Sequence, residues 1–164
     1  MKKIIILSLA TVGILLFASC ASIKTPTPPT NYNTTSTSSL TTAGEQMGEA
    51  IKYFINQKQT KGKINFEDPS TYLQVATIVQ NAKIIKENYK NKELYTAFAN
   101  GLINKSSNII NQNNVDSVIN TLVEKVANND ITQKAQASIT NTQNWISKNQ
   151  DTINAINILL DTLK

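Results

Sequence analysis

Few residues in this 164-residue chain could carry chemistry. The sequence contains no histidine and no arginine, and Cys20 is its only cysteine. Without imidazole there is no base for a serine nucleophile and no nitrogen ligand for zinc. Paired carboxylates or a buried lysine are the remaining catalytic alternatives, but the one adjacent acid pair, Glu67-Asp68, precedes Pro69 and favours helix capping. We therefore predict a protein that is not an enzyme, with no catalytic, metal-binding or cofactor-binding residues and no cofactor.

The residues before Cys20 form a second recognisable pattern. Two lysines follow the initiator methionine, residues 4–16 are almost all apolar, and Ala18-Ser19 stand directly before the cysteine. The apolar run is shorter than the roughly 20 residues of a membrane-spanning helix and has the length of a signal-peptide core. This arrangement resembles the lipobox-type signal of a bacterial lipoprotein. The resemblance implies that residues 1–19 are removed as a signal peptide and that Cys20 is lipidated. An ordinary signal peptide or a membrane helix followed by a buried cysteine is the alternative.

The resemblance also implies a cellular location. Several fatty chains on Cys20 would hold the protein permanently at a membrane, whereas one chain gives reversible binding. Many Gram-negative lipoproteins that stay in the inner membrane carry aspartate after the cysteine, and this chain has Ala21 there. We expect a cell-envelope protein anchored in the outer membrane and facing the periplasm. Removal of the two early lysines lowers the formal charge from +5 to +3, and without arginine we expect no nucleic-acid partner.

Two regions follow the predicted signal peptide. Residues 20–42 comprise the acylated N-terminus and a Pro/Ser/Thr-rich stretch with little to bury, which predicts a disordered tether. From residue 43 onward, apolar residues recur three and four positions apart, the pattern of amphipathic helices. Residues 43–164 are therefore predicted to form an all-α domain, a compact bundle of five or six amphipathic helices.

Local signals place the first two helices. Thr42 and Glu45 resemble a capping box, which predicts a first helix ending near Lys58. Asp68-Pro69 is the strongest helix start in the chain, because the carboxylate can cap and proline is tolerated in the first turn. The second helix is expected to end between residues 88 and 92 and to lie centrally.

The remaining helices follow from periodicity. The third contains Leu94 to Ile103, and its small residues Ala97 and Gly101 leave a strip where another backbone could approach. A fourth is predicted at about 115–128 and a peripheral fifth from Asp130. The sixth begins near residue 151.

Lysines gather at two places, and each cluster allows two interpretations. Lys83, Lys86, Lys90 and Lys92 form a ridge on and after the second helix, while Lys58, Lys61 and Lys63 lie near the first loop. A solvated face is the favoured interpretation, and attraction to anionic lipid head groups is the alternative.

Two functions remain. The first is a non-enzymatic helical interaction module that presents a polar face, or the Ala97/Gly101 strip, to an envelope protein partner or to a second copy of itself. The alternative is a carrier or sequestering protein that binds an apolar or amphiphilic ligand between helices. Six aromatic residues would line such a cavity: Phe54, Tyr72, Tyr89, Tyr95, Phe98 and Trp145.

Overall fold

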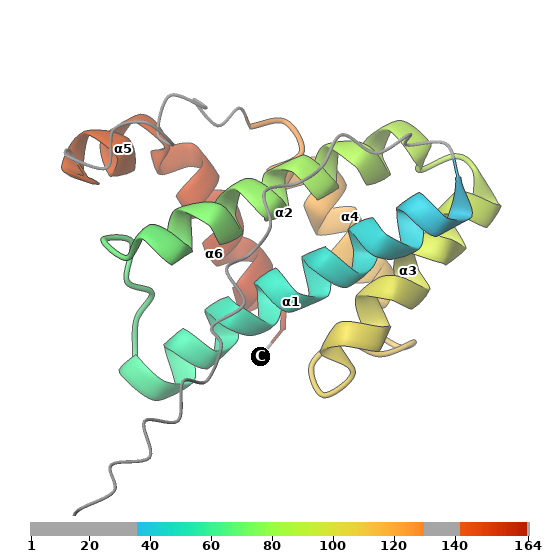
Figure 1. Cartoon of the computed structure of the whole chain (residues 1–164), viewed down its shortest axis with the longest axis horizontal. Coiled ribbons are helices and arrows are strands. Elements are labelled where there is room, and N and C mark those ends of the chain that lie inside the picture. Colours follow the sequence, from blue (N-terminus) through green and yellow to red (C-terminus); the bar gives the residue numbers. More distant parts are fainter. Residues whose placement is uncertain (1–35, 130–141, 164) are drawn as a thin grey trace, which may run out of the picture.

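The computed structural model describes residues 36–129 and 142–163, and within these ranges the chain is all-α (Figure 1). The elements in chain order are α1 (Thr37–Lys61), α2 (Pro69–Asn88), α3 (Lys92–Ser106), α4 (Val115–Thr121), the π-helical turn η1 (Leu122–Val126), α5 (Thr142–Lys148) and α6 (Gln150–Asp161). The predicted fold class, a helical bundle, is confirmed. Among the described helices, none combines the length and the apolar character that crossing a membrane would require.

Helix α1 begins six residues earlier than predicted. Ser36 is its N-cap, and the Ser36 hydroxyl accepts a hydrogen bond from the Ser39 N–H at 3.2 Å. The predicted Thr42/Glu45 capping box is therefore wrong, because Thr42 lies inside the helix and donates its hydroxyl to the Ser38 carbonyl. Residues 37–42 are helical because Leu40 is fully buried in the core, and this tertiary contact outweighs the weak helix propensity of the surrounding Ser and Thr. These residues belong to the helical domain rather than to the tether.

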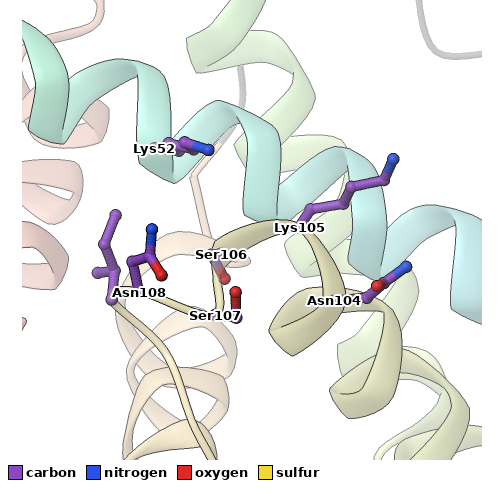
Figure 2. A pocket seen from close by; sticks show the side chains of 7 residues that line it. Lys52, Asn104, Lys105, Ser106, Ser107 and Asn108 are labelled. Atoms are coloured by element: carbon purple, nitrogen blue, oxygen red, sulfur yellow. The ribbon is translucent and has the colours of Figure 1, made fainter.

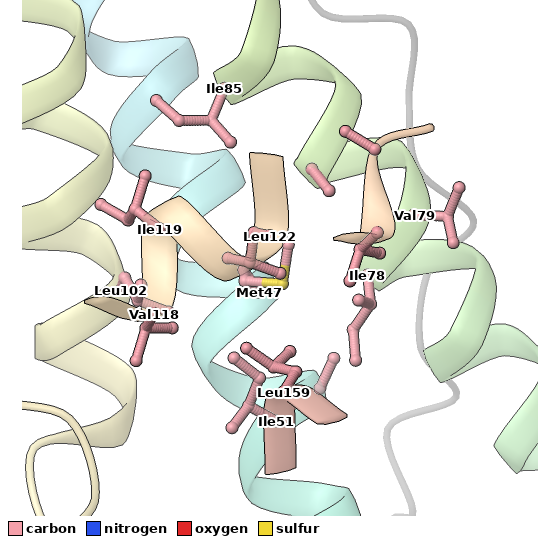
Figure 3. Close-up of a cluster of buried hydrophobic side chains, with 14 of the residues drawn as sticks. Met47, Ile51, Ile78, Val79, Ile85, Leu102, Val118, Ile119, Leu122 and Leu159 are labelled. Carbon is pink, nitrogen blue, oxygen red and sulfur yellow. The ribbon is translucent and has the colours of Figure 1, made fainter. Parts of the chain in front are cut away.

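Helix α2 begins where the sequence predicts. The Asp68 carboxylate accepts the Ser70 N–H at 2.9 Å, and Pro69 occupies the first helical position. The helix is central, because it packs against α1, α3, η1 and α6. Figure 3 shows this core, in which side chains of α1, α2, α3, α4, η1 and α6 meet. The residues labelled there that are fully buried are Met47, Ile51, Ile78, Ile85, Leu102, Ile119, Leu122 and Leu159.

The tightest helix pair is α1 with α3. A Cβ atom added at Gly44 would lie 2.1 Å from the Phe98 carbonyl oxygen, and one added at Gly48 would lie 2.8 Å from the Leu102 carbonyl oxygen. A residue further along α1 therefore contacts a residue further along α3, so the two helices run parallel. We call this contact, formed by Gly44, Gly48 and Gly101 with the facing backbone, the glycine seam.

The Ala97/Gly101 strip contributes Gly101 to the glycine seam. Both residues are buried, and Gly101 lies against the backbone of Thr41 in α1. The expectation that a neighbouring backbone approaches this strip is confirmed. The expectation that the strip could serve an outside partner is wrong, because α1 already occupies it.

The fourth predicted helix is interrupted by a change in helix type. Residues 115–121 are α-helical, and residues 122–126 then form a π-helical turn whose i to i+5 bond joins the Ala127 N–H to the Leu122 carbonyl at 2.8 Å. Leu122 and Val126 are fully buried in this turn. The predicted start of the fifth helix at Asp130 lies outside the described residues. The sixth helix begins at Gln150, close to its predicted start.

Candidate functional site

The one site residue predicted from the sequence, Cys20, lies outside the described residues, as do the predicted signal peptide and the tether up to residue 35. The structure does describe the residue at which the helical domain begins. Ser36 follows Cys20 by 16 positions and is exposed at the start of α1.

A small pocket of about 100 Å³ lies where the end of α3 meets the middle of α1 (Figure 2). Its volume equals a few water molecules, at about 30 Å³ each, and is well below the roughly 300 Å³ at which small-molecule sites begin. Apart from Ile109 its lining is polar: Lys52, Asn104, Lys105, Ser106, Ser107 and Asn108. The sequence did not predict this pocket, because α1 and α3 contribute to it from positions more than 50 residues apart.

Three of the six polar residues that line this pocket have structural partners. The Lys105 ammonium lies 3.6 Å from the Glu49 carboxylate, and the Asn104 amide donates to Glu45 at 2.8 Å. The hydroxyl of the buried residue Ser106 donates to the Leu102 carbonyl. The lining therefore offers positive charge and hydrogen-bond donors to a small polar group.

Two tyrosines form a second polar cluster, where the end of α2 meets α3 and α4. The Tyr95 hydroxyl donates to the Asp116 carboxylate at 2.5 Å, and the Tyr89 hydroxyl donates to the Asn120 side-chain oxygen at 2.5 Å. The two rings meet edge to face, with centroids 5.6 Å apart. Burial, followed by the hydrogen bond to Asp116 and its negative charge, raises the pKa of Tyr95 far above its ordinary value. Tyr95 is therefore a hydrogen-bond donor and not a base.

The six aromatic residues predicted to line a cavity are distributed over different contacts. Phe54 and Phe98 are fully buried core residues, and Tyr72 packs against Trp145 with ring centroids 4.3 Å apart. The other two, Tyr89 and Tyr95, belong to the cluster above. None of the six lines the pocket of Figure 2. Their arrangement gives no support to a ligand cavity between helices, and the carrier function stays a prediction from the sequence.

In the described part of the chain, three acidic residues lie at the starts of helices. Asp68 caps α2, Glu93 lies in the first turn of α3, and Asp151 lies in the first turn of α6, where each complements the helix dipole. Within residues 36–129 and 142–163 no three acids, cysteines or histidines gather in a way that could hold a metal ion. The capping interpretation of the Glu67-Asp68 pair is confirmed for Asp68.

The lysines of the two sequence clusters lie at opposite ends of α1. Lys90 and Lys92 are exposed at the turn between α2 and α3, and the nearby Lys86 contacts the Asn128 side chain. At the other end, Lys61 and Lys63 are exposed, and Lys58 forms an ion pair with Asp161 of α6 at 3.2 Å.

Comparisons with known proteins add no relative: no family model matches the chain, and no curated protein or solved structure is significantly similar to it.

Proposed function

We propose that this chain is a lipid-anchored protein of the cell envelope, located at the outer membrane and facing the periplasm, whose helical domain is a non-enzymatic interaction module. The observation that carries the proposal is the sequence around Cys20: two lysines, a short apolar run and Ala18-Ser19 directly before the only cysteine. The partner is another envelope protein or a second copy of this chain.

The surface of the domain supports an interaction through polar groups. Among the described residues, Tyr89 and Ile158 are the exposed large apolar side chains, with exposed fractions of 40% and 49%. The rest of the described surface is polar or charged, with Asn, Ser, Thr and Lys accompanied by Asp and Glu. Exposed tyrosines are frequent energetic centres of protein interfaces, and Tyr89 is held in place by Asn120 and the Tyr95 ring.

The anchor is tested by comparing the wild-type chain with a Cys20→Ala variant in a bacterial host. We expect the wild-type product to lack residues 1–19, to carry the mass of fatty acyl groups on Cys20 and to fractionate with membranes. The variant should carry no acyl mass. A wild-type product that is soluble and free of acyl groups would contradict the proposal.

The interaction role is tested by chemical cross-linking in intact cells, followed by purification of the tagged protein. We expect one envelope protein, or a dimer of the chain, to be enriched reproducibly. A Tyr89→Ala variant should lower that enrichment, whereas Gln59→Ala, an exposed substitution near the other end of α1, should not. Recovery of abundant neighbours alone, unchanged by Tyr89→Ala, would argue against a specific module.

A further inference from the structure

Helix α5 is held to the domain by few side chains. It has seven residues, fewer than the roughly 12 that an isolated helix needs to be stable in water. Figure 1 shows it at the edge of the bundle. Among its described side chains, Trp145 packs on Tyr72 of α2 and Ile146 is partly buried against the core, whereas Ser147 and Lys148 are exposed. The position of α5 therefore depends on the burial of Trp145 and Ile146.

Buried polar atoms without a hydrogen-bond partner gather around Trp145. They are the indole Nε1 of Trp145, the hydroxyl of Tyr72 and the side-chain oxygen of Asn149. Tyr72 and Asn149 both contact Trp145: the Tyr72 and Trp145 ring centroids are 4.3 Å apart, and the Asn149 amide donates to the Trp145 carbonyl at 2.8 Å. Because each of these atoms gives up its bonds to water without replacing them, packing α5 against α2 has a cost in free energy.

Asn149 has a second arrangement open to it. It is the N-cap residue of α6, but its side chain makes no cap bond, whereas Ser36, Asp68 and Asn91 cap their helices. Its amide is directed back to α5 instead, through the bond to the Trp145 carbonyl. If α5 moved away, the unpartnered oxygen could turn and accept an N–H from the first turn of α6. Asparagine is among the best residues for that role.

We propose that α5 is a detachable strap with two states. In the closed state Trp145 packs on Tyr72, as the structure shows. In the open state α5 leaves α2, the three unpartnered atoms bind water, and Asn149 caps α6. Burial of the large indole favours the closed state, while the unpaired atoms and the missing cap favour the open one, so the two states are close in free energy.

The strap goes beyond the proposed function and holds whether or not Cys20 is lipidated. Opening exposes the indole of Trp145, and tryptophan is enriched among the energetic centres of protein interfaces. The strap therefore gives the helical domain two states that present different surfaces.

The test uses Trp145 as its own reporter, because it is the only tryptophan in the chain. In a nitrogen-15 NMR spectrum of the purified full chain in detergent micelles, its indole N–H gives one resonance. Hydrogen exchange at that proton measures how often the strap opens. The backbone amides of Ile51 and Ile78, two fully buried core residues, report on unfolding of the whole domain. We expect the indole proton to be protected, but at least about tenfold less than these amides.

Tyr72→Phe tests the cost of an unpartnered atom. It keeps the ring and removes the hydroxyl, so it should favour the closed state and slow indole exchange at least about fivefold. Tyr53→Phe is the matched control, because the Tyr53 hydroxyl is hydrogen bonded to the Thr71 hydroxyl at 3.2 Å. Loss of that bond affects both states of the strap equally and should leave indole exchange unchanged.

Asn149→Asp should have the opposite effect. It removes the amide that binds the Trp145 carbonyl and places a buried negative charge there in the closed state, while aspartate caps a helix as well as asparagine does. Indole exchange should become at least about tenfold faster, and the protection of the Ile51 and Ile78 amides should not change.

Several results would overturn the inference. Indole protection equal to that of the core amides would mean that α5 opens only when the domain unfolds. An indole without any protection would mean that the closed state does not form. Equal exchange rates in Tyr72→Phe and Tyr53→Phe, or no acceleration in Asn149→Asp, would show that the unpartnered atoms do not set the balance between the two states.

Discussion

Gly101 of α3 lies directly against the backbone of Thr41 in α1: a Cβ atom at Gly101 would stand 2.1 Å from the Thr41 carbonyl oxygen and 3.0 Å from the backbone nitrogen of Glu45. Backbone atoms cannot move aside as the end of a flexible side chain can. Every atom added at this position must therefore push the two helices apart.

The first prediction concerns this seam. Gly44→Ala and Gly101→Ala should each lower the free energy of unfolding by about 2 kcal/mol, because overpacking outweighs the roughly 1 kcal/mol by which alanine favours a helix over glycine. Urea denaturation followed by circular dichroism measures the change. Asn100→Ala, at an exposed position one residue away, is the control and should be neutral or slightly stabilising.

Gly62 provides a contrasting glycine. It ends α1 with φ of 69°, and an added Cβ would meet no atom within 4 Å. Gly62→Ala should therefore cost about 1 kcal/mol through backbone conformation alone. A loss at Gly62 as large as that at Gly44 would contradict the overpacking explanation of the seam.

The cap of α2 gives the next prediction. Asp68→Ala removes the acceptor for the Ser70 N–H and should lower the free energy of unfolding by about 1 kcal/mol. Glu67→Ala, which changes the same charge at the exposed neighbouring residue, should have little effect. Equal losses in the two variants would show that general electrostatics, and not the cap, stabilises this helix start.

The raised pKa of Tyr95 predicts how the free energy of unfolding changes at alkaline pH. Burial and the contact with Asp116 raise its pKa in the folded state above the ordinary value of 10.0, so the folded protein holds this proton more tightly than the unfolded chain. The resulting contribution to stability is complete below pH 10 and is lost as the pH rises further. Denaturation from neutral to strongly alkaline pH should show a smaller decline in Tyr95→Phe than in the wild type. An identical decline would argue against the assignment.

At Asn81 we predict a substitution that raises the free energy of unfolding. Asn81 is fully buried between α1 and α2, its side-chain oxygen has no hydrogen-bond partner, and its amide makes one long bond of 3.4 Å to Gln46. Asn81→Leu replaces this group by an apolar one of similar shape and should raise the free energy of unfolding by about 1 kcal/mol. Asn81→Asp, with the same shape and a buried charge, should instead be strongly destabilising. Thermal denaturation of the pair measures both signs.

Helix boundaries could be predicted where the signal is local. Asp68-Pro69 combines a cap with a first-turn proline, and the structure begins α2 there. The start of α1 could not be predicted in the same way, because Ser and Thr around Leu40 are typical of loops and the burial of Leu40 depends on distant helices. The π-helical turn at Leu122 has no sequence signal that we recognise.

The glycine seam shows how much of a helix contact can be predicted from the spacing of small residues alone. Ala97 and Gly101, four residues apart, correctly indicated a close backbone approach. Gly44 and Gly48 have the same spacing in α1, and pairing the two motifs would have identified α1 as the neighbour in place of an outside partner. The pocket at Lys52 and Lys105 offered no such signal, because it forms only when the parallel helices are brought together.

The parallel arrangement of α1 and α3 would have a mechanical consequence under the proposed lipid anchoring. A pull on the proposed anchor would enter the domain at Ser36, the cap of α1, and its component along α1 would act parallel to α3. Because the glycines of α1 interlock with the α3 backbone along the direction of pulling, the load is shared by the whole row of contacts as a shear. Under the proposed anchoring, the domain would thus be held through a helix that is locked lengthwise against α3.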